Sequence, residues 1–186
     1  MGLEIEKKYR LTLAQREELL RCLPQAGALL RGEEFEENTL YAGGTLDMER
    51  QVLRLRRVGG KALLTFKQRF ASSAAIKHQR EDETLVDNAD ALHHILCAVG
   101  FAPALVYEKR RATWDIAGAE VVVDELSFGL FVEIEAEEKL ILEIEKTIGL
   151  ADADAEMASY PELAARHGIK RGGLIEARFQ KPLPQA

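Results

Sequence analysis

Charged side chains recur at every second position in several short segments of this 186-residue chain. Near the N-terminus, residues 3–10 place apolar side chains on one face, with Glu4, Glu6 and Lys8 on the other. A period of two is typical of a β-strand, because successive side chains of a strand point to opposite faces. Strands with one apolar and one charged face therefore constrain the fold more than any other feature of the sequence.

The same alternation predicts seven further strands. Their expected ranges are 36–41, 51–57, 61–69, 77–86, 105–115, 120–126 and 131–135. In 105–115 the alternation does not choose a face, because Lys109 and Arg111 alternate with Glu108 and Arg110. On the other strands the expected charged faces carry Arg54, Arg56, Thr65, Lys67, His78, Arg80, Asp82, Glu120, Asp124, Glu133 and Glu135.

The pentapeptide LEIEK occurs twice, at Leu3–Lys7 and at Leu142–Lys146. Around the second copy, apolar residues recur every three to four positions, which is the period of a helix. Residues two apart on a helix point in different directions, so Glu143 and Glu145 are expected to be solvated. Only Glu4 with Glu6 and Glu133 with Glu135 can form converging pairs. Further helices are expected at 12–21, 88–99 and 160–167.

Composition limits the class of protein. The chain is 47% hydrophobic and 30% charged, which predicts a globular fold, and its formal charge of −6 argues against broad nucleic-acid binding. It contains no apolar run of the roughly 18–20 residues that a membrane span needs, and no signal-peptide pattern. We therefore expect a cytoplasmic protein with no membrane or nucleic-acid partner, made of one domain over 1–186 with a core at about 2–163 and a basic tail at 168–186.

Two architectures fit the charged strand faces. The first is an antiparallel sheet whose second face meets water. The second is a closed barrel with helices outside, in which the charges line the lumen. A lumen of buried charges is unfavourable unless they are well paired, so a barrel of this kind needs water, metal and a polyanion. Arginine and lysine bind phosphate oxygens, and paired carboxylates hold Mg²⁺ or Mn²⁺, so the inventory matches a metal-bound triphosphate.

Eight motifs follow one another along about 2–163, in the order EIEKK, LRLRR, LTFKQ, HQRED, YEKRR, VVVDEL, GLFVEIE and SYPEL. This ordered set resembles the CYTH superfamily, the triphosphate tunnel metalloenzymes. The N-terminal EIEKK is similar to the ExExK signature of the superfamily, which is weak alone. The superfamily includes class IV adenylyl cyclases, thiamine triphosphatases and inorganic triphosphatases.

The resemblance implies an α+β fold with a closed eight-stranded antiparallel β-barrel, helices packed outside, and site residues in the tunnel. It implies Mg²⁺ or Mn²⁺ as the cofactor and turns Lys109 and Arg111 inward. Asp82 is expected near the metal side. The implied metal ligands are Glu4, Glu6, Asp124, Glu133 and Glu135, and the implied substrate-binding residues are Lys8, Arg54, Arg56, Lys67, Arg80, Lys109 and Arg111. The implied catalytic residues are Glu4, Glu6, Lys8 and Glu133.

One departure from the family pattern lies at 80–84. Many members carry Arg-x-Glu-x-Glu, whereas this chain reads Arg80-Glu81-Asp82-Glu83-Thr84, which leaves Asp82 as the expected inward acid. A second metal site at this strand is therefore in doubt.

The leading hypothesis is a divalent-metal-dependent triphosphatase acting on inorganic triphosphate or on a nucleotide or thiamine triphosphate, as a monomer or homodimer. The alternative is an adenylyl cyclase that converts ATP to cyclic AMP and pyrophosphate. A third reading is a module that binds polyphosphate without catalysis.

Overall fold

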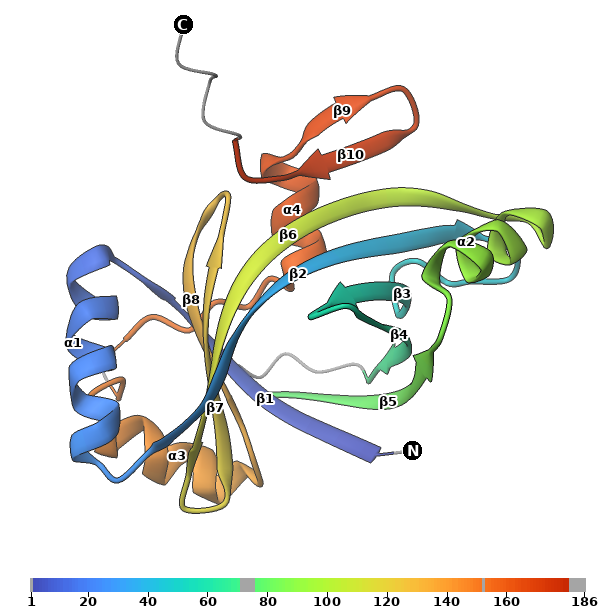
Figure 1. Ribbon diagram of the computed structural model, residues 1–186. Coiled ribbons are helices and arrows are strands. Elements are labelled where there is room, and N and C mark those ends of the chain that lie inside the picture. Colours follow the sequence, from blue (N-terminus) through green and yellow to red (C-terminus); the bar gives the residue numbers. More distant parts are fainter. Residues whose placement is uncertain (1, 71–75, 152, 181–186) are drawn as a thin grey trace, which may run out of the picture.

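The barrel is visible in the computed structural model, which describes residues 2–70, 76–151 and 153–180. Eight antiparallel strands follow the order β2-β3-β4-β5-β1-β8-β7-β6, and the barrel closes where β2 pairs with β6 (Figure 1). The expected α+β class with a closed eight-stranded barrel is confirmed. The strands are β1 (Gly2–Leu11), β2 (Leu29–Gly43), β3 (Gln51–Val58), β4 (Lys61–Arg69), β5 (Ile76–Val86), β6 (Phe101–Ile116), β7 (Ala119–Leu126) and β8 (Gly129–Glu135).

Strand β2 is the largest departure from the expected strands, because only residues 36–41 were predicted to be extended. Its first half contains the acidic segment 33–37, and glutamate has a low strand propensity. The pairing with β6 nevertheless runs from Leu29 opposite Asp115 to Gly43 opposite Phe101. Hydrogen bonding to a long neighbouring strand therefore overrides the local preference.

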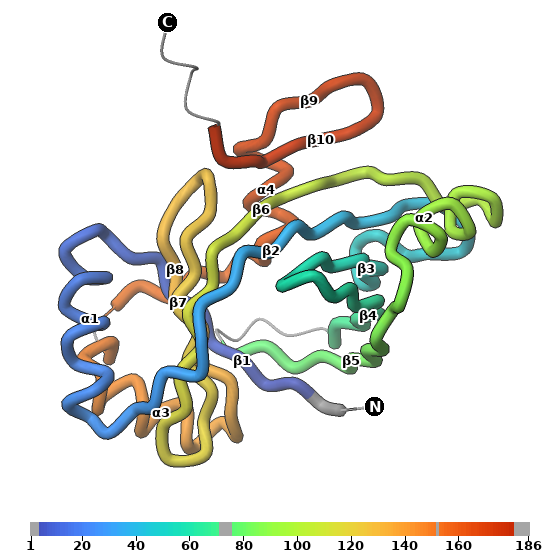
Figure 2. Tube along the Cα trace, viewed as in Figure 1, coloured from blue at the N-terminus to red at the C-terminus, as the bar shows by residue number. Residues whose placement is uncertain are grey.

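Helices cover the outside of the barrel. α1 and α3 share one core cluster, to which they contribute Leu19, Leu23, Ile141 and Ile144. α2 lies at the opposite side of the molecule (Figure 2). α1 begins after the capping residue Thr12, as expected, but it ends later than predicted and includes Pro24 in its last turn. The helices are α1 (Leu13–Gln25), α2 (Ala89–Ala98), α3 (Glu138–Thr147) and α4 (Tyr160–His167).

The outward faces of β7 and β8 form the largest core. Val121, Val123, Val132 and Ile134 are almost fully buried beneath α1 and α3. Burying each such side chain contributes about 1.5–3 kcal/mol. Because side chains alternate along a strand, the apolar outward set fixes the intervening charged set toward the barrel interior.

The C-terminal segment predicted as a basic tail is partly folded. β9 (Ile169–Arg171) and β10 (Leu174–Ala177) form a hairpin, and β10 pairs in parallel with β6. Arg178 then donates to Glu108 on the outer face of β6 at 2.8 Å. This segment therefore lies against the outside of the barrel wall.

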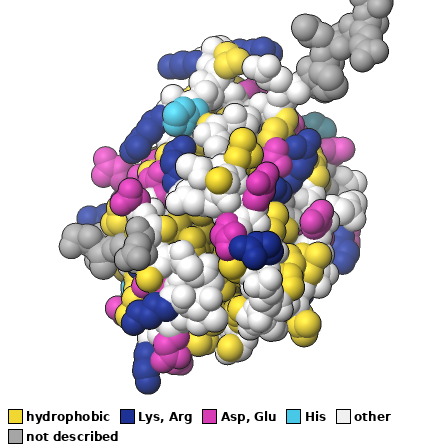
Figure 3. Space-filling view, turned by 90° about the vertical axis from the view of Figure 1, so that its left-hand side faces the viewer, with side chains coloured by type: hydrophobic (Ala, Val, Ile, Leu, Met, Phe, Trp, Pro, Cys, Tyr) yellow, Lys and Arg dark blue, Asp and Glu magenta, His cyan; other side chains and the backbone are white. Residues whose placement is uncertain are grey.

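The described residues contain no helix with the length and apolar character needed to cross a membrane. On the face shown in Figure 3, acidic and basic side chains are interspersed and do not gather into one basic stripe.

Candidate functional site

A cavity of about 500 Å³ lies inside the barrel and is lined mainly by charged side chains. Seven of the eight strands and the start of α4 contribute to its wall. Among the residues expected there, the cavity is lined by Glu4, Glu6, Lys8, Arg54, Arg56, Lys67, Lys109, Arg111, Glu133 and Glu135.

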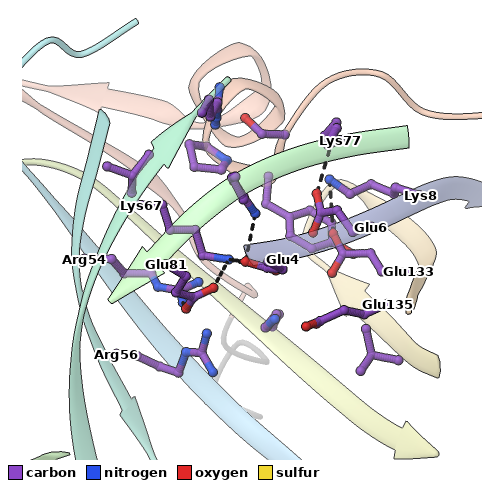
Figure 4. A pocket seen from close by; sticks show the side chains of 18 of the residues that line it. Glu4, Glu6, Lys8, Arg54, Arg56, Lys67, Lys77, Glu81, Glu133 and Glu135 are labelled. Carbon is purple, nitrogen blue, oxygen red and sulfur yellow. Dashed lines mark hydrogen bonds and ion pairs between the residues drawn. The ribbon is translucent and has the colours of Figure 1, made fainter. Parts of the chain in front are cut away.

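Strand register brings Glu6 and Lys8 of the N-terminal motif next to Glu133 and Glu135. Lys8 is paired with Glu133, and Glu6 with Glu135, where β1 meets β8. Cross-strand partners share a face of the sheet, so these four side chains converge in the cavity (Figure 4). The Lys8 ammonium group lies 3.3 Å from Glu133.

The acidic wall is the part of the cavity lined by Glu4, Glu6, Glu81, Glu133 and Glu135, and Glu4, Glu81 and Lys67 form its centre. Lys67 donates to Glu4 at 2.7 Å and lies 2.7 Å from Glu81, while Gln79 donates to Glu4 at 3.0 Å (Figure 4). Burial and the hydrogen bond with Glu81 raise the pKa of Glu4 to about 8. Burial opposes ionisation of Glu81, but its bonds with Glu4 and Lys67 lower its pKa to about 2. The two carboxyl groups therefore share one proton near neutral pH, and a bound cation would displace it.

Glu6 and Glu135 have less positive charge near them than Glu133, which contacts both Lys8 and Arg111. Glu6 has Lys77 as its partner, with 3.7 Å between the ammonium nitrogen and the nearer oxygen. Burial, and then repulsion from Glu120 and Glu6, raises the pKa of Glu135. Carboxylates that resist ionisation beside one another gain from a divalent cation, so this wall fits Mg²⁺ or Mn²⁺ by its donor type.

The carboxylates of the acidic wall do not surround one common point. Among the residues that the structure describes, no three acidic, histidine or cysteine side chains form a ready metal site. Lys67 and Lys77 instead hold Glu4 and Glu6 in ion pairs. A metal would have to take the place of these ammonium groups, which would then be available to an anion.

A cluster of basic side chains, the basic wall, adjoins the acidic wall where Arg111 donates to Glu133 at 2.9 Å. Arg56, Lys109 and Arg111 surround Glu36, at 3.6, 3.4 and 4.0 Å. Burial opposes ionisation of Glu36, but these three cations lower its pKa to about 2. Burial and the charge of Arg111 together lower the pKa of Lys109 to about 8. Both shifts have the direction expected in a strongly positive environment, so this wall favours an anion.

Two guanidinium groups on this wall have unused donors. The buried Nε atoms of Arg54 and Arg56 have no hydrogen-bond acceptor within the described part of the chain. A buried donor without a partner costs about 1–3 kcal/mol, and phosphate oxygens can satisfy it. This observation fits a polyphosphate bound along β3.

Asp124 was expected to be a metal ligand, and that role stays a prediction. It is fully buried, and it does not belong to the cavity lining. Arg111 donates to both of its oxygens, at 2.8 and 2.6 Å, and the Tyr160 hydroxyl donates to one of them at 2.8 Å. Lys109 lies 3.6 Å away. The structure thus places Asp124 behind the basic wall, where it positions Arg111 and Lys109.

The predicted face of β5 is wrong. Arg80 and Asp82 lie on the outside of the barrel, where they form an ion pair at 2.7 Å, and neither lines the cavity. The cause is the register with β1, in which Glu4 is paired with Gln79, so that Gln79 shares the inward face. The inward residues of β5 are Lys77, Gln79, Glu81 and Glu83. Two inward glutamates therefore stand where Asp82 alone was expected, which removes the reason for doubting a second metal site at this strand.

One end of the cavity is closed. Beyond Lys109 on β6 and Glu133 on β8, the next inward positions are Tyr107 and Phe131, and both are buried. These side chains form one core cluster with Leu163 and Ala164 of α4. α4 therefore covers an apolar layer inside the barrel, and the cavity ends at Tyr107 and Tyr160, which both line it.

Sequence reasoning missed several residues of the site. Glu36 was on a predicted strand, but no motif marked it, and Glu81 and Glu83 were assigned to the wrong face. Tyr160 belongs to the SYPEL motif, yet nothing in that motif showed that its ring would enter the barrel.

Comparison with known proteins agrees with this architecture. A family model described as the CYTH domain matches residues 2–158. The PH1012 protein of Pyrococcus horikoshii OT3 is 24% identical, with a TM-score of 0.76, and the match covers 86% of this chain and 98% of that one. A search of curated proteins found no match.

Two other solved structures carry provisional cyclase names. The Vibrio parahaemolyticus adenylate cyclase candidate is 21% identical, with a TM-score of 0.74 and coverage of 88% of this chain and 98% of its own. HpAC1 of Hippeastrum, an adenylyl cyclase candidate with a dominant triphosphatase activity, is 21% identical, with a TM-score of 0.66 and coverage of 84% and 92%. At these identities the likeness establishes a common fold.

Proposed function

Because this chain belongs to the CYTH family, we propose that it is a divalent-metal-dependent triphosphatase that hydrolyses inorganic triphosphate or a simple triphosphate ester. The observation that carries the proposal is the division of one cavity into an acidic wall and a basic wall. Raised pKa values of Glu4 and Glu135 mark the first, and the lowered pKa of Glu36 marks the second. A metal-bound polyphosphate supplies the charge that each wall lacks.

The residues have separate roles in this proposal. Glu4, Glu6, Glu133 and Glu135 would hold Mg²⁺ or Mn²⁺, which when bound offsets charge on the reacting phosphoryl group. The phosphate chain would be held by Lys8, Arg54, Arg56, Lys67, Lys109 and Arg111. These bases fix the chain in line for attack and resist its movement.

The reaction needs one water molecule. Water attacks a terminal phosphorus atom, a bridging P–O bond breaks, and triphosphate yields orthophosphate and pyrophosphate. A carboxylate of the acidic wall orients the water, and Lys8, which faces the cavity beside Glu133, steadies the phosphoryl group. HpAC1 shows that a protein of this fold has triphosphatase activity, but the charges of this cavity carry the proposal here.

The test is to incubate the protein with Mg²⁺ or Mn²⁺ and either inorganic triphosphate or ATP, and to resolve the products by ³¹P NMR. We expect orthophosphate and pyrophosphate from triphosphate, with ATP almost unchanged. Cyclic AMP and pyrophosphate from ATP would establish the cyclase instead. Binding of triphosphate without turnover would identify a binding module.

Two variants and a matched control connect the activity to the cavity. Glu4→Gln and Glu133→Gln should abolish turnover while the thermal midpoint shows a folded protein. Asp82→Asn, on the outer face of β5, should keep wild-type activity. Full activity in both glutamine variants would refute the assignment.

A further inference from the structure

Tyr160 lies at the boundary between the charged cavity and the apolar end of the barrel. It lines the cavity, yet only 6% of its surface is exposed. On one side its ring packs edge-on against Phe131, with 5.4 Å between the ring centroids. On the other side the Lys8 ammonium group lies 4.0 Å from the centre of the ring.

Several contacts hold the ring and the segment before it in place. Its hydroxyl donates to Asp124 at 2.8 Å, which ties it to the support of the basic wall. Lys8 donates to the Ala158 carbonyl at 3.2 Å, so the segment that enters α4 is tied to β1. The Lys109 ammonium group lies 5.5 Å from the ring centre. A rigid aromatic ring thus lies close to two ammonium groups at the closed end.

The acidic wall extends along β1 from this closed end, where Glu133 lies 3.3 Å from Lys8, to Glu4. Lys8 and Glu4 are four residues apart on the strand, about 13 Å at a rise of ~3.3 Å per residue. A linear phosphate chain that enters from the other mouth can advance until its terminal phosphoryl group meets Lys8, Lys109 and the ring.

We propose that Tyr160 is an end stop, which fixes how far a linear polyphosphate enters and therefore which P–O–P bond lies beside the acidic wall. This inference rests on the proposed function and names a specificity-determining residue for it. The ring acts by occupying the space in front of the layer that Phe131 and α4 fill. Removing the ring would therefore free the space that the ring itself takes up.

Inorganic tetraphosphate reports the position of the chain directly. Water attack at a terminal bond gives orthophosphate and triphosphate, whereas attack at the central bond gives two pyrophosphates. Triphosphate gives the same two products whichever end is attacked. The initial products from tetraphosphate, measured by ³¹P NMR in the first few per cent of turnover, therefore reveal the register.

The decisive comparison is between Tyr160→Ala and Tyr160→Phe. Alanine removes the ring and lets the chain advance, so the ratio of the two product pairs should change at least fivefold, or tetraphosphate cleavage should appear where the wild type rejects it. Phenylalanine keeps the ring and loses only the hydrogen bond to Asp124, so its ratio should equal that of the wild type. Tyr160→Leu, which shortens the side chain but keeps an apolar group, replaces the alanine variant if that protein does not fold.

An unchanged product ratio in folded alanine and leucine variants would overturn the end stop without affecting the proposed hydrolysis of triphosphate. If the wild type does not hydrolyse triphosphate, the proposed function fails, and metal-free calorimetry decides the end stop. The ratio of the affinity for tetraphosphate to the affinity for triphosphate should then be at least fivefold higher in Tyr160→Ala than in the wild type. An equal ratio in the two proteins would refute the end stop.

Discussion

The ammonium group of Lys7 lies 2.6 Å from a carboxylate oxygen of Glu145, so the two LEIEK segments contact each other across 138 positions of the chain. Glu145 also accepts a hydrogen bond from the Tyr9 hydroxyl, and it is buried. The expectation that Glu145 is solvated is therefore wrong, whereas Glu143 is exposed as predicted. The pair joins α3 to the outer face of β1, directly behind Glu6 and Lys8.

Removing the charge of Glu145 should weaken the fold. Glu145→Gln loses charge-assisted hydrogen bonds from Lys7 and Tyr9, and we expect the free energy of unfolding to fall by about 1–3 kcal/mol. Glu143→Gln changes the exposed member of the same Glu-x-Glu and should stay within about 0.5 kcal/mol of the wild type. Urea denaturation of both variants measures the difference, and equal values would contradict a structural role for the pair.

Glu36 should stabilise the barrel when it contains no ligand. Glu36→Gln leaves Lys109, Arg56 and Arg111 without their shared anion, so we expect a loss of about 3 kcal/mol in the free energy of unfolding. The variant should gain a larger increase in thermal midpoint from triphosphate than the wild type does, because the anion replaces the missing charge. Glu37→Gln, on the outer face, should show the wild-type response; a smaller response in Glu36→Gln would argue against an anion site on this wall.

The affinity for triphosphate should fall as pH rises through about 8. The pKa of Lys109 is lowered from 10.5 to about 8, so between these values the unfolded chain binds a proton that the folded, ligand-free protein does not. The ligand-free protein therefore gains stability from this group as pH rises above 8, while a phosphate chain that needs the ammonium form binds less well. By calorimetry we expect about a tenfold loss of affinity between pH 7 and 9 from this group. Lys109→Met should lack that component, and identical profiles for the two proteins would exclude Lys109 from binding.

Arginines on opposite faces of the barrel should respond differently. Arg56→Ala should raise KM and lower kcat together, by about 10²-fold in kcat/KM, because its grip on phosphate strengthens in the transition state. Arg80→Ala, whose side chain pairs with Asp82 outside the barrel, should change kcat/KM by less than about twofold. Steady-state kinetics with triphosphate test both, and a large loss in Arg80→Ala would restore the inward face first expected for β5.

The sequence predicts the barrel well because each strand leaves a separate period-two pattern. The patterns do not show which face of a strand points into the barrel where both faces are polar. This is the case in β5, because Lys77, Gln79 and Glu81 alternate with residues that are just as charged. Only the register with β1 chooses between the two faces. The buried state of Glu145 is hidden for a similar reason, because its partners lie in a distant segment and the local helical pattern does not reveal them.

Glu36 and Tyr160 illustrate a different limit. Glu36 is one of several acids on β2, and its local sequence does not indicate the three cations that surround it. Tyr160 begins a helix, and its local sequence does not indicate that the ring lies at the closed end of the cavity. Their roles come from which strands are neighbours, and that information is absent from any single segment.

The closure of the barrel also has a consequence for biosynthesis. β2 cannot pair with β6 before β6 has been made, and β1, which precedes the other strands of the barrel, cannot complete its pairing with β8 before residue 135 has been made. Contacts this distant in sequence form late and slow the folding of a domain. Until then β1 has at most one of its two neighbouring strands, so Glu4 and Glu6 meet Glu133 and Glu135 only when β8 has joined the sheet.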